Sequence, residues 1–395
     1  MQTVESFKTT NRPPDSNRMR VLCAIPSTNQ MYSGVGRALR ELSARMVGRV
    51  DLEFAVDDLN PRNLGLLQAF AVEHGMRVHV GRHRLDPSSC DPVNEALPGV
   101  MAQRRWDAIE LIGFANAATG DAVLEGVGNA LLCYTPHDQP LWTVPMSAEQ
   151  ASRTAEVHRR VVQRADVVLA DSPHERRQLQ ALAPGRNHCN FLPLGCDFDA
   201  FTPGPIDRPP RFLFVGDLNE IRKRFDRVLG VFSRLRETRP DLRLVVVGNR
   251  SEEAGAGLPG SLRSAVDLRG YIDESELRKT YSESLGLFLL SDVEAFGLPI
   301  LEALASGTPV FLSDLETTRG LFGAFRGACF CPTDDPEGTF AVVERSLSRG
   351  REAIAETIAD RPRLQAAFDW NQLAVRKWQA LASAWTRKQG WAWSA

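Results

Sequence analysis

Two glutamates separated by seven intervening residues, Glu294 and Glu302, are the side chains in this sequence best suited to bind hydroxyl groups. One carboxylate can accept two hydroxyl hydrogen bonds at once, so a pair of carboxylates suits a ribose and a sugar ring. The same glutamates could instead only complement the dipole of a nearby helix. The two residue types alone leave both interpretations open.

The residues around this pair predict the elements that position it. Residues 285–290 and 309–312 are apolar runs of buried-strand length. Between them, Pro299 suits the first position of a helix that carries Glu302 in its first turn and ends at Gly307. We therefore expect a loop at the carboxyl end of a parallel sheet, where α/β folds bind ligands. Three loop residues should lie near the ligand: Phe296, Gly297 and Leu298.

Two helix starts are predicted to bind an anion. The helix after Gly297 directs unpaired N–H groups and a positive dipole end at the ligand, which favours a diphosphate. A similar arrangement follows the apolar run 19–25, where Gly34 and Gly36 lead into a helical pattern that extends through Val47. Four arginines make this second helix basic: Arg37, Arg40, Arg45 and Arg49. They suit a solvated face, or a surface that contacts an acceptor or a membrane.

Further candidates follow other apolar runs. His137 comes just after the run 130–134, at the strand end where ligands gather in a parallel sheet. After the run 211–216, the loop contains Asp217 and then three consecutive cations: Arg222, Lys223 and Arg224. These cations could form a solvated surface, or they could neutralise phosphates and a developing leaving-group charge.

Buried-strand patterns recur along the chain, and helical patterns separate most of them. They cover residues 19–25, 51–56, 77–80, 107–112, 130–134, 166–170, 211–216, 242–248, 285–290 and 309–312. This alternation predicts an α/β fold with doubly wound parallel sheets.

Composition narrows the class of protein. Of 395 residues, 43% are hydrophobic and 24% charged, and the formal net charge of −2 gives no overall attraction to nucleic acid or membranes. The length suits two or three domains. Seven cysteines without a C-x-x-C pair predict buried thiols of a reducing compartment. No apolar run approaches the ~18 residues needed to cross a bilayer, and the polar residues 1–17 lack the pattern of a secretory signal.

The stretch Glu294-Ala-Phe-Gly-Leu-Pro, with Glu302 after seven residues, resembles the E-x7-E motif of the family 4 retaining glycosyltransferases. The following Ala305-Ser-Gly-Thr-Pro-Val310 agrees with the same motif. Weaker similarities extend the resemblance over about residues 20–388. The family has the GT-B fold, in which two Rossmann-like doubly wound domains face each other across a cleft.

This resemblance implies a role for each candidate. Glu294 would contact the donor sugar and Glu302 the ribose of the nucleotide. His137 would lie near the sugar and the β-phosphate, and the loop with Gly34 and Gly36 would face the diphosphate. Lys223 matches a family lysine that meets the phosphates.

Two positions depart from the family pattern. Asp217 stands where an arginine is expected, and Arg224 replaces a glycine. An acid near a diphosphate opposes binding. We hypothesise that Arg222 or Arg224 takes over the phosphate contact while Asp217 holds that arginine in place.

The predicted organisation has four parts: a disordered extension over 1–17, an acceptor-side domain over 18–203, a nucleotide-sugar-binding domain over 204–370, and a C-terminal helix and tail over 371–395. Residues 204–210, which include three prolines and a glycine, have the composition of an interdomain linker. Asp197 and Asp199 form a D-x-D sequence, but its place beside this linker argues against a metal site.

The resemblance therefore implies a retaining, metal-independent hexosyltransferase of polysaccharide biosynthesis. A nucleotide-diphosphate sugar is the donor substrate, no cofactor or nucleic acid is expected, and the acceptor is a hydroxyl of a glycan, a lipid-linked sugar or a small molecule. We expect a cytoplasmic protein with peripheral contact at the inner membrane face. Two alternatives stay open: a GT-B glycoside phosphorylase, and a catalytically weak nucleotide-sugar-binding or scaffolding protein, which Asp217 motivates.

Overall fold

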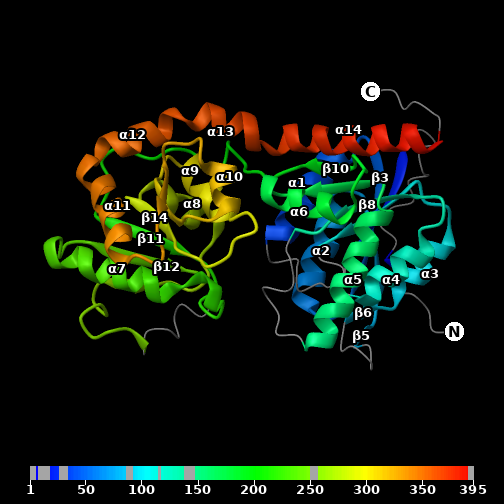
Figure 1. Cartoon of the computed structure of the whole chain (residues 1–395), viewed down its shortest axis with the longest axis horizontal. Coiled ribbons are helices and arrows are strands. Elements are labelled where there is room, and N and C mark those ends of the chain that lie inside the picture. Colours follow the sequence, from blue (N-terminus) through cyan, green and yellow to red (C-terminus); the bar gives the residue numbers. More distant parts are fainter. Residues whose placement is uncertain are drawn as a thin grey trace. The chain divides into compact units, whose positions relative to one another are not determined.

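The structure is a computed structural model that describes residues 6–7, 18–25, 34–85, 92–113, 117–137, 147–249 and 257–389. It divides into two compact units, residues 1–193 with 370–395 and residues 194–369 (Figure 1). Each unit has its own sheet, in which helices connect parallel strands. The predicted pair of α/β domains is confirmed.

Unit 1 contains an eight-stranded sheet in the order β1-β4-β3-β2-β7-β8-β9-β10. Its strands are β1 (Ser6–Phe7), β2 (Met19–Ala24), β3 (Val50–Asp57), β4 (Arg77–Gly81), β7 (Ala108–Ile112), β8 (Leu131–Thr135), β9 (Val167–Ala170) and β10 (Cys189–Phe191). All neighbours are parallel except β1 and β4. A separate antiparallel pair joins β5 (His83–Leu85) to β6 (Pro92–Asn94).

Helices cover both faces of this sheet because successive strand residues point to opposite faces. The helices of unit 1 are α1 (Gly34–Met46), α2 (Pro61–Glu73), α3 (Ala96–Gln103), α4 (Ala117–Gly126), α5 (Ala148–Arg164), α6 (Pro173–Leu182) and α14 (Trp370–Gln389). On one face, Ile109 and Leu111 of β7 join a core with apolar residues of α3, α4, α5 and α6. On the other, α14 packs on α1 and over β8 and β9, and it runs as one long helix along the unit (Figure 1).

Unit 2 contains a six-stranded parallel sheet in the order β13-β12-β11-β14-β15-β16. Its strands are β11 (Arg211–Val215), β12 (Arg243–Val247), β13 (Val266–Leu268), β14 (Gly286–Leu289), β15 (Val310–Ser313) and β16 (Ala328–Cys331). Its helices are the 3-10 turn η3 (Ile221–Lys223), α7 (Phe225–Thr238), α8 (Glu274–Ser282), α9 (Leu298–Ala305), α10 (Glu316–Phe322), α11 (Pro336–Arg349), α12 (Arg351–Ala359) and α13 (Arg361–Phe368). Phe212, Phe214 and Phe288 pack against α7 and α11 in its core.

Every strand that the sequence predicted is present within one residue of its expected ends. The short edge strands β10 and β13 have only three residues each, too few for an apolar pattern to reveal them. Ser6–Phe7 forms a strand instead of part of a disordered extension, because its backbone pairs with Val78 and His79 of β4. The rest of the predicted extension lies outside the described residues.

Residues 194–203 belong to unit 2, although the sequence assigned them to the first domain. The physical reason is that Phe198 and Phe201 are fully buried there. The ring of Phe201 lies edge-on to that of Tyr281 at 5.9 Å, and the Arg361 guanidinium donates to the carbonyl oxygens of Phe198 and Phe201. The change of domain therefore precedes the proline-rich stretch.

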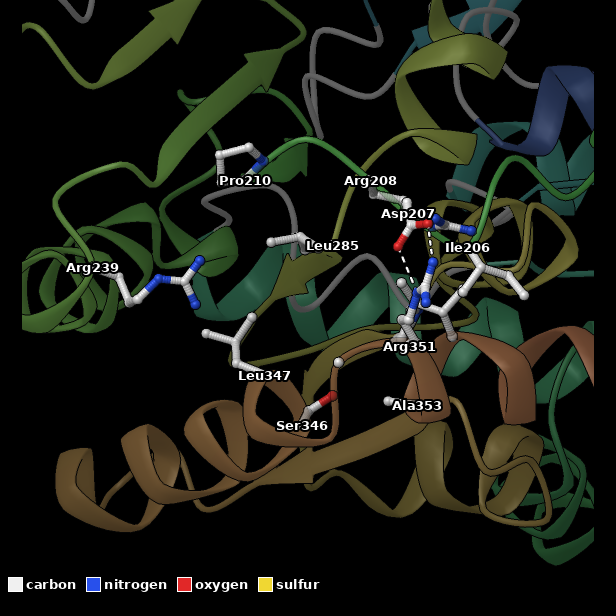
Figure 2. Close-up of a pocket in the computed structure, with 13 residues that line it drawn as sticks. Ile206, Asp207, Arg208, Pro210, Arg239, Leu285, Ser346, Leu347, Arg351 and Ala353 are labelled. Carbon is white, nitrogen blue, oxygen red and sulfur yellow. Dashed lines mark hydrogen bonds and ion pairs between the residues drawn. The ribbon is translucent and has the colours of Figure 1, made fainter.

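A hollow of about 230 Å³ lies in unit 2 beside residues that precede β11, β14 and β15, at the amino-terminal edge of the sheet (Figure 2). Three arginines line it, and the guanidinium group of each already has partners in the protein. Arg208 Nη1 donates to the Ser284 carbonyl oxygen at 2.7 Å. Arg351 Nε donates to Asp207 Oδ1 at 2.6 Å, and Arg239 Nε donates to Asp241 Oδ1 at 3.2 Å. This hollow opens at the opposite edge of the sheet from the loops that carry the candidate site residues.

A buried ion pair joins α14 to the sheet of unit 1. Lys377 Nζ lies 2.7 Å from Glu110 Oε1, and the two residues are only 5% and 2% exposed. Glu110 points to the α14 face because its neighbours on β7 point to the other one. Burial opposes the charge of Lys377, but attraction by Glu110 outweighs it and raises the pKa of the lysine.

None of the helices in the described part of the chain is long and apolar enough to span a bilayer.

We predict that Lys377→Met lowers the free energy of unfolding of unit 1 by about 3–5 kcal/mol, because Glu110 is left buried without a charge partner. Since the pKa of Lys377 is raised in the folded state, the lysine's part in this stabilisation is complete below the unfolded value of about 10.4 and is lost as the pH rises through the folded value. Urea unfolding at neutral pH measures it. Lys388→Met is the matched control: it lies on the same helix but binds the less buried Asp166, so a loss of about 1 kcal/mol or less is expected. Equal losses in both variants would contradict the role of burial.

Candidate active site

The order of the strands brings together two loops that are far apart in the sequence. β11 and β14 are parallel neighbours, and β11 has β12 on its other side. The loops that follow β11 and β14 therefore leave the same edge of the sheet side by side. The Asp292 N–H donates to the Arg222 carbonyl at 2.8 Å, which links the two loops through their backbones.

Glu294 and Lys223 meet where these loops touch. Lys223 Nζ lies 2.6 Å from Glu294 Oε1, and the residues are 8% and 5% exposed. Ser291 Oγ donates to the same oxygen at 2.9 Å, and Arg222 Nη1 lies 3.6 Å from it. Burial opposes ionisation of Glu294, but the charges of Lys223 and Arg222 and the hydrogen bonds from Lys223 and Ser291 outweigh it. The pKa of this carboxyl therefore lies below its ordinary value.

The Lys223 ammonium has capacity for a further ligand. An ammonium has three N–H donors, and its hydrogen bond to Glu294 is the only one among the described residues. Leaving donors of a buried charge unused is costly. A phosphate oxygen would satisfy them.

Arg222 and Arg224 have different surroundings. Arg222 donates to the Val293 carbonyl oxygen at 3.1 Å and lies 2.8 Å from Glu220 Oε2, so it stays beside Glu294. Arg224 has a positive φ of 47°, a conformation that favours the glycine of the family pattern.

Arg224 also directs its guanidinium away from Glu294. Its Nη2 donates to Asp226 Oδ2 at 2.9 Å, and its Nη1 to Asp292 Oδ1 at 3.2 Å. Of the two arginines, only Arg222 therefore contributes to the environment of Glu294.

The hypothesis that Asp217 holds one of these arginines is wrong. Asp217 Oδ1 accepts from the Asn219 N–H at 2.8 Å, and Oδ2 accepts from Asn249 Nδ2 at 2.9 Å. The reason is topological: Asn249 lies in the loop after β12, on the opposite side of β11 from β14. The Asp217 carboxylate thus joins the β11 and β12 loops.

Glu302 lies on α9 and is held by a second buried contact. Tyr281 is fully buried on α8, and its hydroxyl donates to Glu302 Oε2 at 2.8 Å. The helix begins at Leu298, one residue before the predicted start, so Glu302 follows the first turn instead of lying within it. Gly307 ends the helix as predicted, with a φ of 70°.

Gly297 and Phe296 shape the loop that precedes α9. Gly297 has a φ of 84°, a conformation that favours glycine, and a Cβ there would displace the end of the Ile300 side chain, whose Cδ1 would lie 2.7 Å away. Phe296 is buried, with its ring 5.6 Å from that of Phe322 and 6.0 Å from that of Phe368. Its ring anchors the loop to the core of unit 2.

In unit 1, His137 is also positioned by a loop that follows a strand of the parallel sheet. It follows β8, and Asp171 follows the parallel neighbour β9, so the two side chains meet. His137 Nδ1 lies 2.8 Å from Asp171 Oδ2, and both residues are buried. A carboxylate at Nδ1 holds the proton on that nitrogen and orients the ring. Asp171 Oδ1 has no hydrogen-bond partner among the described residues.

The sequence did not single out three of these residues: Ser291, Tyr281 and Asp171. Tyr281 and Asp171 lie beside a candidate only in the folded chain. Ser291 is three residues from Glu294 in the sequence, but its hydrogen bond to that carboxylate depends on how the loop folds. For Asp171 a signal existed, because it follows an apolar run just as His137 does. The other predicted phosphate-binding element, with Gly34 and Gly36, forms the first turn of α1. The loop before it lies outside the described residues.

Comparison with known proteins identifies the family. The sequence model described as glycosyl transferases group 1 matches residues 197–357, and the model described as a glycosyl transferase 4-like domain matches residues 33–195. The chain is a family 4-like glycosyltransferase of the GT-B fold.

Curated relatives agree at the level of sequence. The phosphatidyl-myo-inositol mannosyltransferase of Mycobacterium tuberculosis is 27% identical over 252 residues, which cover 59% of this chain and 63% of the relative. The glycogen synthase of the same organism is 28% identical over 183 residues, 46% of this chain and 44% of the relative. The chain thus spans less than two thirds of the length of the curated relatives it matches.

Solved structures agree at the level of fold. The sucrose-phosphate synthase of Thermosynechococcus elongatus superimposes with a TM-score of 0.72 at 19% identity, covering 93% of this chain and all of that one. HepE of Anabaena, solved in complex with UDP-glucose, gives a TM-score of 0.72 at 14% identity with the same coverage. At these identities the glycosyltransferase fold is shared.

We predict that Arg222→Ala weakens the binding of a nucleotide sugar about tenfold or more, because it removes a cation that holds Glu294 ionised. Arg224→Ala should change it less than about twofold, since its guanidinium serves Asp226 and Asp292. Titration calorimetry with the nucleotide sugar that binds the wild type best compares the two. Equal effects would show that the two arginines are interchangeable.

Proposed function

We propose that this glycosyltransferase moves a hexose from a nucleotide-diphosphate sugar to an acceptor hydroxyl with retention of configuration. The single observation that carries the proposal is the buried Lys223–Glu294 pair at the carboxyl edge of the unit 2 sheet. It places spare ammonium donors beside an ionised carboxylate, which together suit a phosphate and a hydroxylated sugar ring. The UDP-glucose bound to HepE supports a donor of this class.

Each residue of unit 2 then has a chemical task. Lys223 and the N-terminus of α9 would stabilise the charge that develops on the departing diphosphate. Glu294 would orient the donor sugar, and Glu302, fixed by Tyr281, would accept from the ribose hydroxyls. The protein's contribution to the rate is positioning and electrostatic stabilisation.

His137 of unit 1 is proposed to donate a hydrogen bond to the donor sugar near the β-phosphate. Its contact with Asp171 supports this role, because the ring orientation is already fixed before any ligand binds. The helix start at Gly34 and Gly36 is proposed as a further phosphate contact.

The acceptor is proposed to be a glycan, a lipid-linked sugar or a small molecule. The match to a relative named for a phosphatidyl-inositol substrate supports the lipid-linked class. The same match supports peripheral contact with a membrane, to which the arginines of α1 would contribute. The protein is further proposed to lie in the cytoplasm, at the inner face of that membrane. Of the arginines of α1, Arg45 already donates hydrogen bonds to the side chains of Glu41 and Asn371 within unit 1.

We expect a panel of UDP-glucose, GDP-mannose and ADP-glucose to contain a donor that raises the melting temperature and is slowly hydrolysed by the wild type. Binding at a hundredfold excess over Kd adds about 2.7 kcal/mol to the stability. Glu294→Gln keeps the shape and an acceptor for Lys223, so the protein should stay folded and lose hydrolysis at least about a hundredfold. Binding without hydrolysis by the wild type would favour a binding protein, and dependence on inorganic phosphate would favour a phosphorylase. Near wild-type turnover in Glu294→Gln would contradict the assigned site.

We also expect activity to survive EDTA. Lys223 and two helix N-termini are proposed to balance the diphosphate charge, so a divalent cation is not needed for that purpose. Of the Asp-x-Asp residues near the linker, Asp197 accepts instead from the Asp199 and Ala200 backbone N–H groups. Loss of turnover with EDTA and its recovery with Mn²⁺ or Mg²⁺ would refute metal independence.

A further inference from the structure

The two oxygens of Glu294 have different surroundings. Oε1 accepts from Ser291 Oγ at 2.9 Å and from Lys223 Nζ at 2.6 Å, with Arg222 Nη1 at 3.6 Å. Oε2 accepts no hydrogen bond from the described residues, and it is not among the buried oxygens that lack a partner. One oxygen is therefore held by the protein, while the other reaches the solvent.

We propose that Ser291 is a positioning residue for the donor sugar: by holding Oε1 of Glu294 together with Lys223, it reserves Oε2 for the sugar hydroxyls. This inference rests on the proposed function of Glu294 as the residue that orients the donor sugar. Ser291 itself does not touch the substrate in this account.

The placement of Ser291 explains why it can fix the carboxylate. It is fully buried and lies two residues after the end of β14, so its backbone is close to the edge of the sheet. Lys223 belongs to η3, in the loop after β11. Residues of two loops therefore donate hydrogen bonds to the Glu294 carboxylate.

Two separate donors also restrict the rotation of the carboxylate. A single donor at Oε1 would leave the carboxyl group free to turn about its last side-chain bond, because that torsion has broad minima. A second donor from another direction removes this freedom before the substrate arrives, which lowers the cost of ordering on binding.

The hydrogen bond from Ser291 also favours the ionised form of Glu294. The charged groups within 4.0 Å of this carboxylate among the described residues are Lys223 and Arg222, both cations, and Arg222 is itself paired with Glu220. Loss of the hydroxyl should raise the pKa of Glu294, since one of the interactions that lower it disappears. The acid limb of the pH–activity profile would then move to higher pH.

The experiment compares Ser291→Ala with wild type, using the best donor of the panel and its nucleoside diphosphate alone. We expect the variant to bind the diphosphate within about twofold of wild type, but to lose about tenfold or more in affinity for the nucleotide sugar. Its hydrolysis rate should fall, and the acid limb of its pH profile should shift upward.

Ser284→Ala is the matched control. Ser284 is equally buried in unit 2 and its hydroxyl donates at 2.6 Å, but to the Thr280 carbonyl oxygen instead of a site residue. This substitution should leave the ratio of the affinities for the diphosphate and the nucleotide sugar unchanged, even if it lowers the melting temperature.

The outcomes separate this inference from the proposed function. A wild type that binds none of the nucleotide sugars would refute the proposed function itself. Suppose instead that the wild type binds and hydrolyses a donor. A Ser291→Ala variant that matches it, or that loses affinity for the diphosphate and the nucleotide sugar equally, would then refute only the positioning role of Ser291.

Discussion

The buried contact between Lys223 and Glu294 is the interaction on which the candidate site of unit 2 depends. An isolated carboxylate or ammonium with so little exposure would be strongly disfavoured, and each makes the other tolerable. The pair can form only because β11 and β14 are neighbours, so that the loops after them leave one edge of the sheet together. The order of the strands therefore determines whether the charged pair of the site can form.

The same rule accounts for the other contacts between loops. Asp217 and Asn249 join the loops after β11 and β12, and His137 and Asp171 join those after β8 and β9. In every case two parallel neighbours end at the same edge, and polar side chains just beyond them pair. These hydrogen bonds join neighbouring loops in the absence of a ligand.

Buried charge also serves structure away from the site. Lys377 and Glu110 lie on the face of the unit 1 sheet that α14 covers, and their contact attaches the last helix to β7. A buried pair of this kind contributes less to stability than its geometry suggests, because both groups lose hydration.

The sequence by itself determined most of the fold and the location of the main candidates. Apolar runs of strand length marked ten strands to within one residue, and the spacing of Glu294 and Glu302 pointed to the family. These features are local: burial on both faces of a parallel strand demands a continuous apolar run, and a helix start demands particular residues.

Only the tertiary structure decided which side chains meet. The strand order β12-β11-β14 sends Asp217 toward Asn249 and Lys223 toward Glu294, although Asp217 and Lys223 lie in the same loop. Nothing local in the sequence distinguishes Ser291 or Tyr281 from other polar residues. Tyr281 meets Glu302 from 21 residues away, and Lys223 meets Glu294 from 71 residues away. Such pairings depend on topology, which local patterns do not encode.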